Sequence, residues 1–441
     1  MRLRFRTQGS PKPAAIKTGV RILVVGNGAR EDALSWRLAQ SPSCAALFAA
    51  PGNAGTASRG ENWPIPATDG KALAERARAE RIDLAVLGPE TAIAAGVGDR
   101  MREAGIAVFG PNRSAGRLES SKIFAKRFME RHAIPTAKAI VVHSVEAARN
   151  ALANWDGGVV VKADGLAAGK GVVVAPDARA ARALVNEWYE RGKIPGGGAD
   201  LLLEERLEGR EVSLFAFCDG RAIVPFAAAC DYKRAGDGDA GPNTGGMGAY
   251  SPPARLPEDL ADTVRERVLA PLLRGLRAES EEYVGVLYCG LMWSDDGPRV
   301  IEFNARFGDP ETQVLMPRVG GDFAALLDSV ARGAMDLSTV SVLPDHCVGV
   351  VLATRDYPRS STPLHGLNAD VALEHGCQAF WGASQRIDGS VSSGGGRVLT
   401  VTALGSELDA ARERAYGAVK QLAGRLGTGA LTYRSDIAQL R

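Results

Sequence analysis

"RVIEFNARFGDPETQ" (residues 299–313) is the stretch that decides the fold of this chain. It begins as an apolar strand, and alternation along a strand predicts that Glu302 and Asn304 point to the same face. A carboxylate and an amide oxygen aimed together form the hard-oxygen environment that Mg²⁺ prefers when it bridges nucleotide phosphates. Arg306 stays in register if the strand continues, and there it could clamp a transferring phosphoryl group. The stretch therefore predicts a strand end that holds metal and phosphate.

The same residues also allow a purely structural interpretation. Arg306 could form a salt bridge with Asp309 or Glu311 and only stabilise the turn. For any single side chain this explanation is as good as the functional one. It is weaker for the whole cluster, because three carboxylates, an amide and a guanidinium are crowded at one strand end.

Upstream, KADGLAAGKGV (162–172) places a glycine-rich loop between two apolar strands. It is not a Walker loop, because Asp164 stands at the first glycine position and Gly171 follows Lys170 where Ser or Thr is required. A loop between two strands instead predicts a mobile flap whose amides fold over a triphosphate. Lys162, just before the loop, would reach the phosphates as a point charge.

LEERLEGRE (203–211) follows another apolar strand. The spacing from Glu204 and Glu205 to Glu211 allows a hinge whose backbone contacts a base while Glu211 turns towards a ribose. A solvated strand end explains the glutamate pair equally well, so this signal is weak alone.

The N-terminal part alternates apolar runs with glycine turns, at 20–38, 45–56, 82–90 and 106–111. This pattern indicates a parallel α/β unit of about 100 residues, with ligands at the carboxyl ends of its strands. GNGARE (26–31) lacks the third glycine of a dinucleotide fingerprint, and no acid follows to hold a ribose. What remains is a set of backbone amides at a helix N-terminus, which suits a phosphate.

Composition limits the partners and the compartment. The chain has 441 residues, 45% hydrophobic, with a formal net charge of +2. So small a net charge does not recruit nucleic acid or an anionic membrane, and no apolar run reaches the roughly 18 residues of a membrane span. Six cysteines and five histidines are scattered, which favours reduced thiols in the cytoplasm. The first 19 residues are basic and lack the apolar core of a secretory signal.

Four motifs together carry a family resemblance: RFGDPETQ (306–313), PNTGGMGAYSP (242–252), KADGLAAGKGV (162–172) and APGNAGTA (50–57). They closely resemble the phosphoribosylamine–glycine ligase family, over about residues 20–440. The resemblance implies an α/β and α+β multidomain fold: a Rossmann-like N-terminal domain, an ATP-grasp core with a mobile lid, and a small C-terminal domain. The domains implied are a basic disordered tail (1–19), a Rossmann-like substrate-phosphate domain (20–118), the lid with its preceding helix (119–207), the catalytic domain (208–340) and a C-terminal domain (341–441).

The reaction implied by this resemblance joins 5-phosphoribosylamine to glycine in purine biosynthesis. ATP is the co-substrate, Mg²⁺ or Mn²⁺ is the cofactor, and the products are glycinamide ribonucleotide, ADP and phosphate. Glycine's carboxylate does not react with an amine, so it must first become glycyl phosphate. Charge neutralisation and positioning supply most of such catalysis. The expected partners are small molecules alone, with no nucleic acid or membrane, and the expected form is a cytoplasmic monomer.

The resemblance also assigns residues to roles. The catalytic residues are Arg306 and Asp309, and the metal ligands are Glu302 and Asn304. The ATP-binding residues are Lys122, Lys162, Gly165, Gly169, Gly171, Glu204, Glu205, Leu207 and Glu211. The substrate-binding residues are Gly28, Gly52, Asn53, Gly55, Asp231, Lys233, Asn243, Thr244, Gly245, Gly246 and Met247.

Two positions depart from the family pattern. Asp32 and Tyr232 stand where family members commonly have histidine. Asp32 lies in a first helical turn, where the helix dipole favours a carboxylate, so a structural role is expected. If that helix end faces the sugar phosphate, however, Asp32 would oppose it.

Two other functions stay open at this point. Another ATP-grasp ligase, such as a carboxylase subunit, would share Lys122, Lys162, Glu302 and Asn304, but it would not need RFGDPETQ or PNTGGMGAY. A catalytically inactive nucleotide-binding relative would not need a suitable residue at every expected phosphate and metal position, and this chain has one at each.

Overall fold

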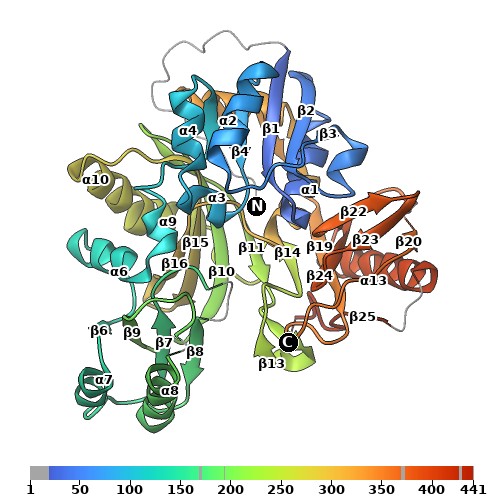
Figure 1. Cartoon of the computed structure of the whole chain (residues 1–441). Coiled ribbons are helices and arrows are strands. Elements are labelled where there is room, and N and C mark those ends of the chain that lie inside the picture. Colours follow the sequence, from blue (N-terminus) through green and yellow to red (C-terminus); the bar gives the residue numbers. More distant parts are fainter. Residues whose placement is uncertain (1–18, 168–170, 193, 369–372, 427–429, 441) are drawn as a thin grey trace.

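Figure 1 shows the whole chain as a computed structural model, which describes residues 19–167, 171–192, 194–368, 373–426 and 430–440. The predicted basic tail lies outside these ranges except for Gly19, and so do Gly169 and Lys170 of the glycine loop. Within the described residues, no helix is both long and apolar enough to cross a membrane.

The N-terminal part is a parallel sheet with helices packed against it. Its strands run in the order β3-β2-β1-β4-β5, and each pairing is parallel, as the alternating sequence predicted. The glycine turns after β1 and β4 lie at the carboxyl edge of this sheet, where parallel sheets bind ligands. The strands are β1 (Val20–Gly26), β2 (Cys44–Pro51), β3 (Glu61–Asn62), β4 (Leu84–Leu87) and β5 (Ala107–Phe109). The helices are α1 (Ala29–Leu38), α2 (Gly70–Ala79), α3 (Glu90–Ala94) and α4 (Val97–Glu103), with the turn η1 (Thr56–Ser58).

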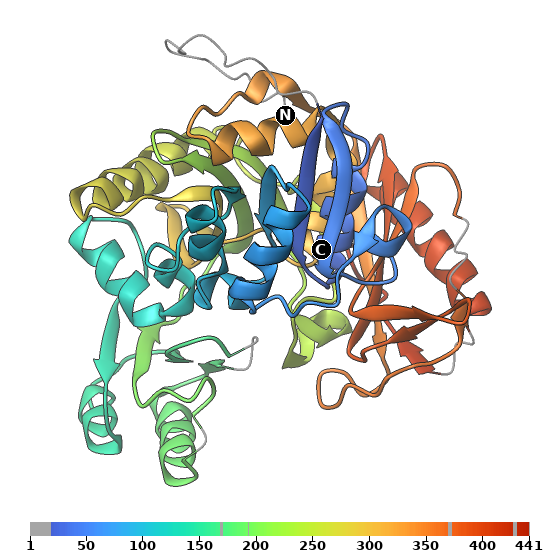
Figure 2. The same cartoon turned by 45° about the horizontal axis from the view of Figure 1, so that its top comes forward.

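The lid is a small antiparallel sheet with its own core. Its strands run in the order β6-β9-β7-β8, and in Figure 2 it projects at the lower left with its two helices. Val159, Val161 and Leu203 are buried against α7 and α8, so the neighbouring residues on each strand face the other way. The elements here are α5 (Arg117–Ser120), α6 (Lys122–Arg131), β6 (Ala139–Val142), α7 (Val145–Ala151), β7 (Val159–Ala163), β8 (Val172–Ala175), α8 (Ala178–Glu190) and β9 (Leu201–Glu205).

A nine-stranded antiparallel sheet runs through the rest of the molecule. Its order is β16-β15-β10-β11-β14-β19-β24-β21, with β25 beside β19. Because β14 pairs with β19, the sheet continues past residue 340 into the C-terminal part. Its strands are β10 (Arg210–Asp219), β11 (Ile223–Asp231), β14 (Gly248–Ser251), β15 (Val284–Ser294), β16 (Gly297–Asn304), β19 (His346–Thr354), β21 (Cys377–Trp381), β24 (Arg397–Gly405) and β25 (Leu431–Thr432).

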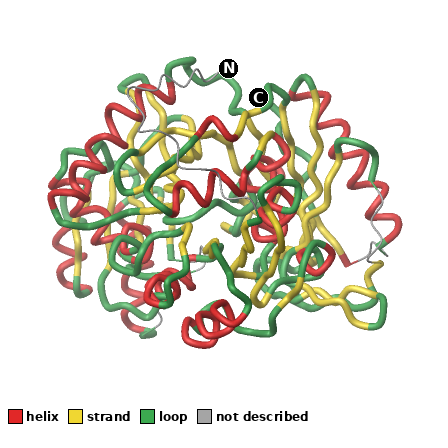
Figure 3. The backbone as a smooth tube through the Cα atoms, turned by 90° about the horizontal axis from the view of Figure 1, so that it is seen from above, coloured by secondary structure: helices red, strands yellow, loops and turns green. Residues whose placement is uncertain are grey.

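Helices and small sheets cover this large sheet, and Figure 3 shows helices on both sides of the molecule with strands between them. The helices are α9 (Leu260–Val264), the π-helical turn η3 (Arg265–Leu269), α10 (Ala270–Ala278), α11 (Glu311–Leu315), α12 (Phe323–Ala331) and α13 (Leu408–Arg425), with the turns η2 (Asp237–Asp239), η4 (Met316–Arg318) and η5 (Leu337–Thr339). The small sheets are β12 (Arg234–Gly236) with β13 (Ala240–Asn243), β17 (Val319–Gly321) with β18 (Val340–Val342), and β20 (Leu367–Asn368), β23 (Ser390–Ser393) and β22 (Ser384–Ile387).

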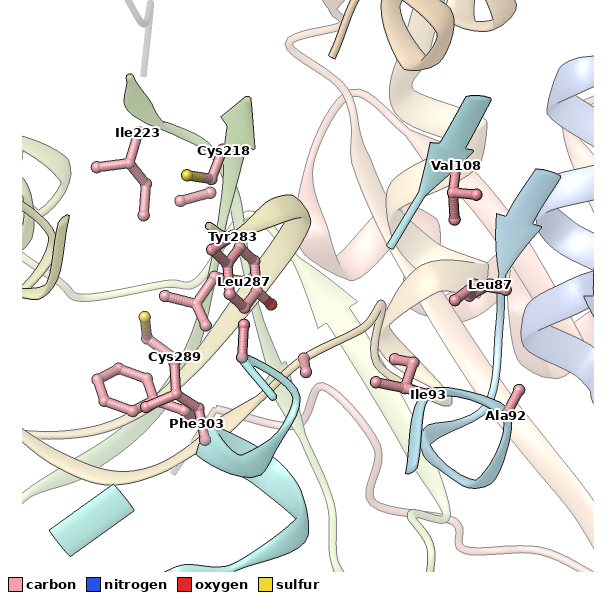
Figure 4. Close-up of a cluster of buried hydrophobic side chains, with 14 of the residues drawn as sticks. Leu87, Ala92, Ile93, Val108, Cys218, Ile223, Tyr283, Leu287, Cys289 and Phe303 are labelled. Atoms are coloured by element: carbon pink, nitrogen blue, oxygen red, sulfur yellow. The ribbon is translucent and has the colours of Figure 1, made fainter. Parts of the chain in front are cut away.

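One apolar cluster joins the N-terminal sheet to the large sheet. It contains Leu87 of β4 and Val108 of β5 together with Leu287 of β15 and Phe303 of β16, and Figure 4 shows part of it. Burying a side chain of this kind contributes about 1.5–3 kcal/mol relative to leaving it exposed. The cluster therefore holds the N-terminal sheet firmly against β16, the strand that carries Glu302 and Asn304.

Candidate active site

The face of the lid sheet opposite its helices carries a buried ionic triad. The Glu204 carboxylate lies 2.7 Å from the Lys162 ammonium and 2.8 Å from the Lys126 ammonium. All three side chains are only 3–4% exposed. Lys162 also donates to the Ile301 carbonyl at 2.9 Å, which links the lid to β16. Because one carboxylate is shared by two ammonium groups, the triad keeps a net positive charge.

An apolar surface adjoins this triad. Val160 pairs with Glu204 on one side and with Val174 on the other, so all three lie on the same face of the lid sheet. Val174 is 42% exposed. An accessible apolar shelf beside buried charge is suited to a flat base attached to a phosphate chain.

Lys122 lies at the start of α6, against the beginning of the glycine loop. Its ammonium donates to the Gly165 carbonyl at 2.8 Å. Asp164 accepts from the Ser121 hydroxyl and from the Ile123 amide, each at 3.1 Å, and so fastens the loop to the helix. Gly165 has φ +96°, a left-handed conformation that favours glycine. Gly171 closes the loop before β8, and Gly169 lies outside the described residues.

The pKa of Lys122 lies below its ordinary value, mainly because the side chain is buried. The Glu302 carboxylate opposes this effect and the Lys162 ammonium adds to it. For Glu302 the balance is the reverse. Burial raises its pKa, but Lys233, Lys162 and Lys122 together outweigh burial and bring the pKa below its ordinary value, with help from the Asn304 amide. Glu302 is therefore an ionised carboxylate in the field of three lysines.

Glu302 and Asn304 lie side by side at the end of β16, as strand alternation predicted. They pair in register with Gly290 and Tyr288 of β15. Among the described residues, no group of three or more His, Cys, Asp or Glu could hold a metal ion by itself. The two oxygen donors fit a hard divalent cation that takes its other ligands from phosphate and water.

The segment 231–248, which we call the acceptor loop, lies beside Glu302. Lys233 forms an ion pair with Glu211 of β10. Burial, together with the carboxylates of Glu311, Glu211 and Glu302, raises the pKa of Asp231 to about 8, although Lys233 opposes this rise. Glu211, Asp231 and Lys233 are therefore brought together with Glu302.

The remaining predicted residues of the acceptor loop form a tight turn. The Thr244 hydroxyl donates to the Lys233 carbonyl at 2.9 Å and accepts from the Gly246 amide at 2.9 Å. The Met247 amide donates to the Tyr232 carbonyl at 2.8 Å. Asn243 reaches the lid, where its amide donates to the Val172 carbonyl at 3.4 Å.

Arg397 of β24 joins this turn to the RFGDPETQ motif. Its guanidinium donates to the Gly245 carbonyl at 2.8 Å and lies 3.1 Å from the Asp309 carboxylate. Burial raises the pKa of Asp309, but the charges of Arg397 and Arg30 and the Gln313 amide outweigh burial and lower it. Asp309 is thus an ionised anchor between the C-terminal part and the large sheet.

Arg306 is held by carboxylates from elements before the lid. It pairs with Glu90 of α3 at 3.1 Å and with Glu119 of α5 at 2.8 Å, and it donates to the Asn304 side-chain oxygen at 3.3 Å. These partners differ from Asp309 and Glu311, which the structural interpretation of the sequence expected. The cluster is therefore not a local salt-bridged turn.

The N-terminal loops approach the same region. The side-chain amide of Asn53 donates to the Gly28 carbonyl at 2.9 Å and to the Trp381 carbonyl of β21 at 2.8 Å. A side chain at Gly28 would contact Asp309, and one at Gly52 would collide with Asn62. These close approaches place the loops of β1 and β2 beside the RFGDPETQ motif and the C-terminal part.

Asp32 does not face solvent, and its carboxylate lies against the turn that contains Gly55. It is fully buried, pairs with Arg59 and accepts from the Trp381 amide at 2.7 Å. A Cβ atom at Gly55 would collide with its carboxylate. Burial raises the pKa of Asp32 to about 6, against the opposing effects of Arg59 and the Trp381 amide. The Asp32 carboxylate therefore joins α1 to Arg59 and to β21, which is compatible with a structural role.

The other predicted ATP-binding residues lie at the end of β9. Glu205 accepts from the Lys138 amide at 2.9 Å and pairs with Arg299, so its carboxylate is engaged by the protein. Leu207 is half-buried just beyond the strand.

Sequence reasoning missed Lys126, Glu90, Glu119 and Arg397 as parts of this region. A signal existed for Lys126, because it lies four residues after Lys122 and therefore on the same face of a helix. The other three come from distant elements and carry no local signal.

Two shallow hollows, of about 220 and 420 Å³, lie elsewhere on the molecule and share Arg102, Glu282 and Val284. Neither is lined by a predicted site residue. The candidate site is therefore defined by the charged side chains and hydrogen bonds that meet at the end of β16, and it lies away from both hollows.

Comparison with known proteins covers nearly the whole chain. Family models of phosphoribosylglycinamide synthetase match at residues 20–119 (N domain), 120–312 (ATP-grasp domain) and 347–440 (C domain). The chain is 43% identical over 424 residues to the phosphoribosylamine–glycine ligase of Caulobacter vibrioides, covering 94% of this chain and 97% of that protein. It is also 43% identical over 403 residues to that of Escherichia coli O157:H7, covering 90% and 94%.

Solved structures give the same result. The phosphoribosylamine–glycine ligase of Thermotoga maritima matches with a TM-score of 0.81 and 32% identity, covering 95% of this chain and 100% of that one. The biotin carboxylase domain of Hydrogenobacter thermophilus 2-oxoglutarate carboxylase, solved with MgADP and bicarbonate, has a TM-score of 0.72 at 14% identity, covering 95% and 92%. The latter likeness concerns the fold alone.

Proposed function

This chain belongs to the phosphoribosylglycinamide synthetase family, the phosphoribosylamine–glycine ligases, and from that premise we propose how its residues divide the reaction. It is an ATP-dependent ligase that joins 5-phosphoribosylamine to glycine in purine biosynthesis. The fold and family expected from the sequence are thus confirmed. The residue roles, the metal and the intermediate are the subject of the proposal.

We assign the ATP phosphates to Lys122, Lys162 and the glycine loop between β7 and β8. The observation that carries this assignment is the convergence of Lys122, Lys162 and Lys233 on the ionised Glu302. The Glu204 carboxylate is shared between Lys126 and Lys162. Its negative charge therefore does not fully neutralise the Lys162 ammonium. The base would lie on the shelf formed by Val160 and Val174.

We propose that the backbone of residues 205–207 borders the adenine and that Glu211 contacts the ribose. Glu211 is paired with Lys233 through one carboxylate oxygen, so its other oxygen can accept from a ribose hydroxyl while the ion pair stays closed. Sharing of this carboxylate would couple nucleotide binding to the acceptor loop.

Glu302 and Asn304 are the proposed ligands of Mg²⁺ or Mn²⁺. When bound, such an ion supplies charge neutralisation between the transferring phosphate groups. The Arg306 guanidinium is occupied by the carboxylates of Glu90 and Glu119, and it donates to Asn304. We therefore propose that Arg306 contributes mainly by orienting Asn304.

The acceptor loop is the proposed glycine site, because it lies between Glu302 and the RFGDPETQ motif. A glycine carboxylate oxygen attacks the γ-phosphorus and ADP leaves, which gives glycyl phosphate. The amine of phosphoribosylamine then attacks the acyl carbon, loses a proton, and phosphate leaves. Positioning and charge supply most of the acceleration in such transfers. The turns that contain Gly28, Gly52, Asn53 and Gly55 are proposed to anchor the sugar phosphate.

One experiment tests this division of roles at the level of substrates. Purified protein with ATP and Mg²⁺ should release ADP when both glycine and phosphoribosylamine are present, with one glycinamide ribonucleotide formed per ADP. Bicarbonate in place of glycine should give no ADP. Bicarbonate-dependent ADP release without glycine would instead favour a carboxylase-type reaction.

We also propose that the enzyme acts as a cytoplasmic monomer without nucleic acid or membrane partners. The supporting observations are the small net charge of +2 and the scattered cysteines. Light scattering of the purified enzyme tests the oligomeric state, and a dimer at micromolar concentration would overturn that part of the proposal.

A further inference from the structure

The residues 433–438, which we call the C-terminal brace, are fastened to the acceptor loop far from them in sequence. The brace follows β25 and lies against the hairpin of β12 and β13. Figure 1 shows β13 at the lower centre of the view, with β25 to its right. The hairpin tip from Asp237 to Pro242 is exposed to solvent. Its order therefore depends on contacts at its base and on the brace.

Arg434 is the centre of this contact. Its side chain is only 1% exposed, although its partner Asp239 is 68% exposed. The guanidinium lies 2.8 Å from the Asp239 carboxylate and donates to the Arg234 carbonyl at 3.1 Å. It also pairs with Asp436 of the brace at 2.7 Å. Arg434 thus reaches both β12 and the η2 turn of the hairpin.

The aromatic ring of Tyr232 lies beneath the same guanidinium. The carbon of the Arg434 guanidinium is 4.8 Å from the ring centroid, a cation–π contact. The Tyr232 hydroxyl accepts from the Ala438 amide at 2.9 Å. Tyr232, one of the two departures from the family pattern, is thus held at both its ring and its hydroxyl by the brace.

Two further contacts fasten the hairpin tip. The Ser435 amide donates to the Asp237 carboxylate at 2.8 Å, and the Ser435 hydroxyl also pairs with Asp237. The Gly238 amide donates to the Asp436 carboxylate at 2.8 Å. The brace therefore holds the hairpin at its first strand and at its tip.

This hairpin connects Lys233 directly to Asn243 and Thr244. Lys233 pairs with Glu211, and Thr244 bonds to the Lys233 carbonyl. A displacement of the hairpin must move both ends of this turn, because β12 and β13 are paired at Arg234 and Asn243. Small displacements of reacting groups have large effects on rate.

We propose that Arg434 is a positioning residue for glycine, acting through the hairpin to set the place of Lys233 and Thr244. The inference rests on the proposed assignment of the acceptor loop to glycine. The proposed phosphate contacts of ATP depend on it far less, because Lys122, Lys162 and Glu204 belong to α6 and the lid.

The test compares Arg434→Met with the wild-type enzyme in steady-state kinetics. The variant should raise the KM for glycine roughly 10-fold or more, because the glycine site is displaced. The KM for ATP should change much less, because the phosphate-binding lysines of α6 and the lid lie outside the hairpin. Hydrogen exchange should quicken in peptides that cover residues 232–244. Asp239→Asn weakens the same contact from the exposed side of the hairpin. It should also raise the KM for glycine more than the KM for ATP, even if Arg434→Met folds poorly.

Two controls separate this inference from the loop assignment. Arg414→Met removes a guanidinium of α13 that donates to the Leu404 carbonyl at 2.8 Å, and it should leave both KM values unchanged. Lys233→Met should raise the KM for glycine if the acceptor loop holds that substrate. Loss of stability in Arg434→Met and Asp239→Asn with unchanged KM for glycine, alongside a raised value in Lys233→Met, would overturn the positioning role alone. An unchanged value in Lys233→Met would overturn the loop assignment and the inference with it.

Discussion

At the scale of single residues, the least expected feature is the sharing of Glu204 between two lysines. Sequence motifs pointed to Lys162 and Glu204 separately. Their ion pair, and the contact of Lys126 with the same carboxylate, could be recognised only once β7 was seen to pair with β9. A buried carboxylate needs a partner of opposite charge, and Glu204 has two. We therefore propose that Lys126 keeps Lys162 available for phosphate without contacting the nucleotide itself.

Lys126→Met tests this account of the triad. Glu204 would then pair with Lys162 alone and draw its charge away from the phosphates, so the KM for ATP should rise. Loss of a hydrogen bond to a charged group should lower the free energy of unfolding by about 1.5–3 kcal/mol. The control is Lys138→Met, since Lys138 is exposed nearby. An unchanged KM for ATP in Lys126→Met would show that Lys126 only fills space.

Alternation of side chains correctly placed Glu302 and Asn304 on the same face of β16. The partners of Arg306 were not predictable in this way. Glu90 and Glu119 lie far upstream, and only the packing of the N-terminal sheet on the large sheet brings them to Arg306. Local pattern therefore predicted the direction of side chains but not the pairing of charges over long distances.

At the scale of elements, long apolar runs were predicted well and short or broken elements were not. The runs of β1, β2, β4 and β5 gave the parallel sheet, whereas β3 has only two residues and no periodicity to read. The helix α6 begins at Lys122, where Ser121 caps it through its hydroxyl, and α5 is a separate short helix before it. The segment from α9 to α10 contains a π-helical turn and ends at Ala278.

The lid should respond to nucleotide as a unit. Lys122 and Asp164 already fasten the first part of the glycine loop to α6, so ATP with Mg²⁺ should add contacts across β7 and β8. Hydrogen exchange in peptides that cover these strands should slow when nucleotide is added, while exchange in α13 should stay the same. Equal exchange in the lid with and without nucleotide would remove the lid from the mechanism.

At the scale of the whole molecule, the N-terminal sheet, the large sheet and the C-terminal part meet around the RFGDPETQ motif. Asn53 and Asp32 both bond to the backbone of Trp381. Arg397 joins Asp309 to Gly245 from the C-terminal side. None of these contacts has a local sequence signal, so the sequence did not predict the residues that join these parts of the molecule.

Asp32 makes this junction dependent on pH. Its pKa rises from 3.8 to about 6 in the folded protein, with burial as the largest cause. The folded state therefore holds the proton more tightly than the unfolded chain, and the Asp32 contribution to stability is greatest at low pH and is lost as pH rises through about 6. A shift of this size corresponds to about 3 kcal/mol.

Asp32→Asn should remove this dependence. Denaturant unfolding between pH 4.5 and 7.5 gives the difference in free energy of unfolding, wild type minus variant. That difference should fall as pH rises, by at most about 3 kcal/mol. Parallel curves for the two proteins would mean that Asp32 ionises normally in the fold.

The central claim is that the end of β16 holds the metal and phosphates, and Glu302→Gln tests it most directly. Glutamine keeps the size of the side chain and removes the negative charge of a carboxyl group that three lysines keep ionised. Turnover should be measured as glycine-dependent ADP release while Mg²⁺ is titrated. We predict that turnover falls by roughly 10²–10³ at limiting Mg²⁺, as when one preorganised charge is lost, and that high Mg²⁺ restores part of it. Wild-type turnover by the variant at limiting Mg²⁺ would contradict the account, because Glu302 would then hold neither metal nor phosphate in place.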